Sequence, residues 1–221
     1  MVICTCKQMV SVRGVVAFLL VLILGAGCAT PVRQAYKVDE SLPIGNIQGD
    51  YFLGERFRFK VRIPTGWQGA TRYPEFLVEQ GYGLEGLKAT PFFLFNPVTQ
   101  SSLQVDFSSA GTTGRFDQGI IEALTKMAGG SLMSDLEEEY GKNFPVELSK
   151  VTPMQLKGVP YAARMSALYT VKEQQWERGW IYAFAEPYQI FIFYHITGGS
   201  RGADREAIEQ ALSSFEYLGI H

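Results

Sequence analysis

The most reactive side chains of this sequence are three cysteines and two histidines, and Cys28 has the most informative surroundings. It follows two small residues and an apolar run from Gly14 to Leu24, with Lys7 and Arg13 further upstream. A basic lead-in, an apolar run and small residues are the parts of a secretory signal. The run is too short for a bilayer core, which needs roughly twenty apolar residues. The pattern predicts export, with a thiol at the cleavage site.

The segment Leu24-Gly25-Ala26-Gly27-Cys28 resembles the lipobox of bacterial lipoproteins. The resemblance implies that signal peptidase II removes residues 1–27, a signal peptide that starts at Met1 or Met9. It also implies that palmitate and a diacylglyceryl group on Cys28 attach the chain to a membrane of the cell envelope. Two or more acyl chains are needed for stable attachment. Because Gly25 stands where the lipobox prefers leucine, cleavage by signal peptidase I, which leaves a free thiol, is the alternative.

The residue after the cysteine bears on which membrane holds the chain. Ala29 stands there in place of aspartate. This is similar to the lipoproteins that are sent to the outer membrane. We therefore expect the periplasmic side of the outer membrane rather than the inner membrane.

His195 is the strongest candidate for catalysis, because it lies inside an apolar segment while His221 is the last residue. The sequence contains no His-Glu-x-x-His arrangement and no Gly-x-Ser-x-Gly elbow. A serine and an aspartate could join His195 in space and form a hydrolase, but a lone histidine in a strand is more often structural. We expect no enzymatic activity, no cofactor and no metal site, with a hydrolase using His195 as the alternative.

Two other patterns suggest ligands but have simpler explanations. The glycine-dense segment Gly81–Gly86 has no lysine-serine or lysine-threonine pair after it, so a loop is favoured over a phosphate cradle. The carboxylates of Asp135 and Glu137–Glu139 would point in different directions on a helix, so they do not converge on one cation. We expect them to face solvent.

A row of cations is the clearest candidate for an interaction face. From Arg56, basic residues alternate with apolar ones, which predicts a half-buried strand; the outward cations are Arg56, Arg58, Lys60 and Arg62. They could bind anionic headgroups or an acidic partner protein, or they could pair with Glu75 or Glu79 on a neighbouring strand. The net charge of −2 offers no general attraction to nucleic acid.

The rest of the chain predicts one α+β domain at residues 51–221, after a flexible tether at residues 28–50. Apolar alternation predicts strands at 75–79, 91–95, 102–108, 146–156, 161–171, 175–185 and 188–197. Helical spacing predicts a helix with Thr113 as cap that ends at Gly129-Gly130, a short second helix at 133–140 and a final helix. The buried side of the first helix would carry Phe116, Ile120, Ile121, Leu124 and Met127, and that of the last Ala207, Ile208, Ala211, Leu212 and Phe215.

Two strands are unusually aromatic. The first carries Trp176, Arg178, Trp180, Tyr182 and Phe184 on one face, and the second carries Tyr188, Ile190, Ile192, Tyr194 and Ile196. Such rows form either the wall of a ligand site or a core under helices, and the core is favoured because aromatic cross-strand pairs normally stabilise sheets.

The order of strands and helices predicts an antiparallel sheet packed with two or three helices. Pro64-Thr65-Gly66-Trp67 after the first strand, the central helix, the turn at Gly158 and Ser213-Ser214-Phe215 resemble the PsbP/Mog1/DcrB-like α/β sandwich group. The resemblance spans roughly residues 51–218 and implies a non-enzymatic role in binding or assembly. We therefore expect an envelope lipoprotein with a protein partner, or one that binds a lipid or an apolar small molecule.

Overall fold

The fold is described from a computed structural model for residues 37–79, 92–111, 115–198 and 201–219. All the described residues lie in one compact unit. Cys28, Thr113 and the glycine-dense segment lie outside the described residues. Among the described residues, no helix has the length and apolar character needed to cross a membrane.

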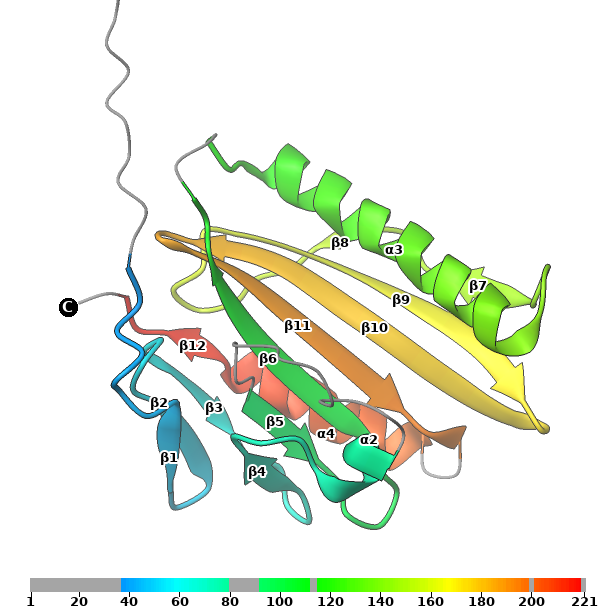
Figure 1. Cartoon of the computed structure of the whole chain (residues 1–221), viewed down its shortest axis with the longest axis horizontal. Coiled ribbons are helices and arrows are strands. Elements are labelled where there is room, and N and C mark those ends of the chain that lie inside the picture. The colour runs from blue at the N-terminus through cyan, green and yellow to red at the C-terminus, as the bar shows by residue number, and fades with distance from the viewer. Residues whose placement is uncertain (1–36, 80–91, 112–114, 199–200, 220–221) are drawn as a thin grey trace, which may run out of the picture. The chain divides into compact units, whose positions relative to one another are not determined.

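The centre of the fold is a large antiparallel sheet (Figure 1). Its strand order is β4-β5-β6-β11-β10-β9-β7, and β8 also pairs with β9. The bounds are β4 Gln68–Ala70, β5 Phe92–Phe95, β6 Ser102–Ser109, β7 Val146–Leu148, β8 Thr152–Pro153, β9 Tyr161–Val171, β10 Gln174–Ala185 and β11 Tyr188–Ile196. The three long predicted strands are confirmed to within a residue, whereas the predicted strand 146–156 is two short strands that both pair with β9.

The segment predicted as a strand at 75–79 is the short helix α2 (Glu75–Glu79), so that prediction is wrong. Pro74 accounts for the difference, because the amides of Leu77 and Val78 both donate to its carbonyl. A proline at a helix start has its φ already set for the helix and loses no hydrogen bond.

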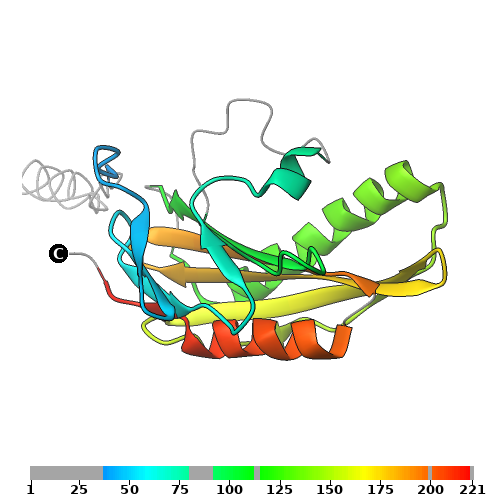
Figure 2. The ribbon, with the colours of Figure 1, turned by 90° about the horizontal axis from the view of Figure 1, so that it is seen from below.

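A smaller sheet and the last helix cover one face of the large sheet (Figure 2). The smaller sheet has the order β1-β2-β3-β12, with bounds Gly45–Gln48, Tyr51–Gly54, Phe59–Arg62 and Glu216–Tyr217. Helix α4 (Arg201–Ser214) buries Ile208, Ala211 and Leu212, as predicted. Strand β1 and the buried Ile44 fall in the range predicted as a tether, so that range extends too far into the domain.

Helix α3 (Gln118–Tyr140) packs against β9 and β10 on the opposite face. Asp117 caps it, since the carboxylate accepts a hydrogen bond from the amide of Ile120 at 2.9 Å. The predicted break at Gly129-Gly130 is wrong, because one helix runs through both glycines. A Cβ atom at Gly129 would lie 3.2 Å from the Trp180 ring, so glycine allows close approach of helix and sheet.

The two aromatic rows lie on opposite faces of the sheet. Trp180 faces α3 and donates its indole N–H to the carbonyl of Thr125 at 2.7 Å. The row from Tyr188 to Ile196 is buried against α4 and the small sheet. Core packing is therefore confirmed for the β11 row and for Trp180, and the α+β class is confirmed.

Candidate binding site, an aromatic trough on the sheet

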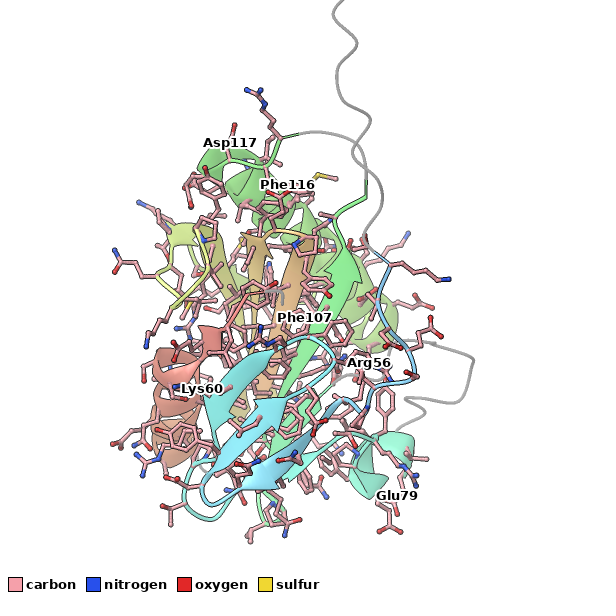
Figure 3. All side chains as sticks on the ribbon, turned by 90° about the vertical axis from the view of Figure 1, so that its left-hand side faces the viewer. Arg56, Lys60, Glu79, Phe107, Phe116 and Asp117 are labelled. Carbon is pink, nitrogen blue, oxygen red and sulfur yellow. The ribbon has the colours of Figure 1, made fainter. Side chains whose placement is uncertain are left out.

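The predicted row of cations is not one continuous face. Arg58 has a φ of 47°, which interrupts the extended backbone, and β3 begins only at Phe59. Arg56 instead donates from Nε to the carbonyl of Leu42 at 2.8 Å and from Nη2 to that of Glu40 at 2.9 Å. Figure 3 shows Arg56 and Lys60 far apart.

The other two cations of the row have acidic partners. Lys60 pairs with Glu216 at 2.8 Å, and this hydrogen-bonded pair raises the pKa of Lys60. Arg62 pairs with Asp50, also at 2.8 Å. The expected partners Glu75 and Glu79 are thus replaced by other carboxylates. The structure does not assemble the four cations into one free anion-binding face.

His195 lies on the α3 face and stacks on Trp176 with ring centroids 5.1 Å apart. Burial, with a smaller effect of Arg178, lowers the pKa of His195 to about 3. Ser102 lies directly across the sheet from it, yet no hydrogen bond joins the two side chains in the described part of the chain. The buried Nε2 has no hydrogen-bond partner there. A histidine in this state is a weak base, and no carboxylate of the described residues forms a hydrogen bond with it as in a hydrolase triad.

Metal ligation finds no support in the same region. Within the described residues, no three histidine, cysteine or acidic side chains lie close enough together to hold an ion. Glu139, one of the acidic residues of the α3 C-terminus, pairs instead with Arg178 at 3.5 Å.

The α3 face contains a sector that, among the described elements, neither α3 nor the α2 segment covers, and sequence reasoning missed it. Helix α3 packs on β9 and β10, while Tyr73 and Phe76 contact the β5 rings of Phe93 and Phe95. Strands β11 and β6 lie between these two covers (Figure 1). Their side chains on this face are half-buried, and together with Tyr182 of β10 they form what we call the trough: Gln104, Asp106, Tyr182, Phe191 and Phe193.

The floor of the trough is aromatic. Tyr182 and Phe191 are cross-strand neighbours with ring centroids 4.8 Å apart. Phe193 pairs with Trp180 along the same strands, so its ring continues the floor towards His195. Half-exposed aromatic rings in a row supply apolar contact area that neither helix covers.

One edge of the floor carries a carboxylate in apolar surroundings. Asp106 accepts a hydrogen bond from Gln104 Nε2 at 2.6 Å, and among the described residues it forms no ion pair. Burial raises the pKa of Asp106 to about 6. Burial and the nearby Asp106 charge also raise the pKa of Tyr73. A cation placed here would stabilise the ionised carboxylate.

The wall of the trough is the side of α3 that faces β11. Leu124 and Ala128, one helical turn apart, pack against the clusters that contain Tyr182. Above them, Ile120 is 41% and Met127 is 69% exposed, which contradicts their predicted place on the buried side. The wall is therefore apolar at its base and at its rim.

Two hollows lie elsewhere in the domain. A cavity in the core beside Phe59 and Phe92 holds only about 10 Å³, the space of one water molecule. An open hollow of about 470 Å³ lies between β1 and β4, lined by Ile47, Ile63 and Trp67 among others. Ligand pockets typically measure about 300–1,000 Å³, so of these two only the second could receive a small molecule.

Comparison with protein-family models finds no match, and comparison with curated proteins finds none either. Three solved structures are similar to the chain. LpqN of Mycobacterium tuberculosis, described as involved in cell envelope biogenesis, has 13% identity and a TM-score of 0.46 over 72% of this chain and 82% of its own. Cyanobacterial PsbP from Synechocystis has 13% identity and a TM-score of 0.49 over 80% and 99%. A protein from Bacteroides thetaiotaomicron has 9% identity and a TM-score of 0.45 over 78% of this chain and 50% of its own. A PsbP is thus among the similar folds.

Proposed function

We propose that this chain is a lipoprotein of the bacterial cell envelope, attached to a membrane through lipid on Cys28, and that its domain binds a protein partner without catalysis. The trough is the observation that carries the binding role, since an open aromatic face rimmed by apolar side chains is typical of protein interaction sites. The lipobox-like segment before Cys28 supports the attachment.

The attachment is tested by feeding cells labelled palmitate and isolating the full chain. The wild type should carry label and sediment with membranes. Cys28→Ser should lose the label and remain uncut by signal peptidase II. Cys6→Ser is the matched control, because it removes a thiol from the predicted signal and should behave as the wild type does. Equal labelling of wild type and Cys28→Ser would refute the attachment.

The binding role is tested by purifying the tagged full chain from detergent-solubilised membranes and quantifying what accompanies it. A stoichiometric protein partner is expected. A chain that purifies alone at every detergent and salt concentration would contradict this part of the proposal.

A second candidate function is the binding of an apolar small molecule or lipid. The open hollow lined by Ile47, Ile63 and Trp67 favours it, because its size suits a small ligand. Native mass spectrometry of the delipidated protein would decide, with a bound apolar species expected for this function and none for the protein-binding one.

A further inference from the structure

The width of the trough matches one helix. Neighbouring strands lie about 4.8 Å apart, so β11 and β6 together present a strip about 10 Å wide. An α-helix with its side chains is about 10 Å across. Helix α3 occupies the strip beside it, over β9 and β10. The open strip is therefore the place where a second helix would lie next to α3.

The length of the floor sets the size of that helix. Along β11 the side chains on this face are Phe191 and Phe193 of the trough and then His195 beside Trp176, a row about 13 Å long at 3.3 Å per residue. A helix rises 1.5 Å per residue, so about nine residues, or two and a half turns, would cover this floor. Such a segment would present three or four side chains to the trough.

The wall of α3 suits contact with another helix. Over its first three turns the trough side carries Leu124 and Ala128, with Ile120 and Met127 at the rim and no charge among them. The opposite side carries Glu122 and Lys126. Apolar and small side chains allow two helices to approach to 8–10 Å.

The charges beside the trough indicate which charge a partner segment would carry. Asp106 lies at the β6 edge of the floor with no ion pair in the described part of the chain. Asp135 and Glu138 follow at helical spacing on the trough side of α3, and both are exposed. Acidic groups on both margins favour a basic occupant.

We propose that the trough binds an amphipathic helix of a partner protein, with its apolar side on Phe191 and Phe193 and a lysine or arginine paired with Asp106. This inference rests on the proposed protein-binding function and names the surface and the chemistry of the partner. A small apolar molecule fits the trough less well than it fits the hollow beside Ile47, Ile63 and Trp67, since the described elements line the trough only along its floor and sides.

The experiment is photocrosslinking in living cells from the full, membrane-attached chain. A benzophenone amino acid replaces Phe193 or Gln104 in the trough and, as control, Val98, which is 88% exposed on a turn elsewhere. Mass spectrometry then identifies the crosslinked peptide. Both trough positions should capture the same partner segment, with amphipathic helical periodicity and a basic residue within one turn of the crosslink, while Val98 should not.

Charge variants test the pairing. Asp106→Asn should lower the crosslink yield at Phe193 at least fivefold, whereas Glu147→Gln, on the distant edge strand β7, should leave it unchanged. Reversal to Asp106→Lys should abolish the crosslink, and changing the captured basic residue to aspartate should restore it. A melting curve for each variant shows whether it is folded. Restored crosslinking between Asp106→Lys and the aspartate variant of the partner would show that the charge pair itself is responsible, even if Asp106→Asn lowers the yield by disturbing the surface.

The outcomes separate this inference from the proposed function. Crosslinks to lipid, to a second copy of this chain, to a segment without a basic residue, or to nothing would overturn the helix proposal. If a stoichiometric partner still co-purifies in that case, the proposed function stands and only its surface is wrong. If no partner co-purifies either, both fail.

Discussion

Asp106 is a carboxyl group whose charge state depends strongly on its surroundings. Its raised pKa, about 6, means that the folded protein binds a proton which the unfolded chain, with an ordinary pKa of 3.8, has already released. Between these values the folded state holds more protons, so this carboxyl makes the protein more stable as the pH falls from about 7 to 4.

Asp106→Asn tests this sign. The amide keeps a polar group beside Gln104 and removes the charge, so the variant should be more stable than the wild type at pH 8 by about 3 kcal/mol. The difference should vanish near pH 4. Urea unfolding at the two pH values measures it. A variant that is equally or less stable at pH 8 would show that the carboxylate is already neutralised by a partner.

His195 should act in the opposite direction. Its folded pKa of about 3 lies below the ordinary 6.5, so the unfolded chain binds a proton that the folded protein excludes. Stability from this residue is complete above pH 6.5 and is lost as the pH falls towards 3. His195→Phe keeps a ring against Trp176 and removes the titration. The difference in free energy of unfolding between variant and wild type should be about 3 kcal/mol more favourable to the variant at pH 4 than at pH 8. Chemical denaturation at the two pH values measures it. If the free energy of unfolding varied with pH in the same way for both proteins, His195 would not contribute to the pH dependence of stability.

At the scale of elements, the pair β10–β11 depends on a glycine under a tyrosine. The ring of Tyr194 lies over Gly179 of the neighbouring strand, and a Cβ atom there would be 2.0 Å from Cζ. Tyr194 cannot easily move, because it is fully buried, accepts hydrogen bonds from Arg164 and donates one to Glu177. Arg205 of α4 pairs with the same Glu177, so this network joins α4 to the sheet.

Gly179→Ala should therefore destabilise the fold by about 3 kcal/mol, since overpacking forces a buried ring and its partners to shift. Gly130→Ala is the matched control. Gly130 lies inside α3, and a methyl group added there would meet nothing within 4 Å, so alanine should stabilise the helix by about 0.5–1 kcal/mol. Thermal unfolding of both variants compares them, and similar melting temperatures would disprove the packing argument.

The elements also show what could be predicted from sequence. Strands β9 to β11 were predictable because their apolar residues alternate without interruption between clear turns. The continuity of α3 was not, because a glycine pair normally ends a helix, whereas here Gly129 makes room for Trp180 and Met165 inside the helix. The trough was not predictable, because the pairing of Asp106 with Phe191 depends on the register between β6 and β11, which are far apart in the chain.

At the scale of the whole molecule, the domain begins earlier than its apolar pattern indicates. Ile44 is buried in the main core, and β1 pairs with β2 from Gly45 to Gln48. Arg56 holds the segment before β1 through the carbonyls of Glu40 and Leu42. These contacts are polar and irregular, so a search for alternating residues does not find them.

Two truncations test where the domain starts. A chain that begins at Lys37 keeps Ile44, β1 and the Arg56 contacts, so it should unfold at the same temperature as the full mature chain. A chain that begins at Tyr51 loses the Ile44 side chain from the core, which costs about 1.5–3 kcal/mol, and exposes the edge of β2. Its melting temperature should fall by several degrees, since 1 kcal/mol shifts a domain of this size by about 2–4 °C. Equal melting temperatures would mean that residues 37–50 contribute nothing to the fold and belong to the tether after all.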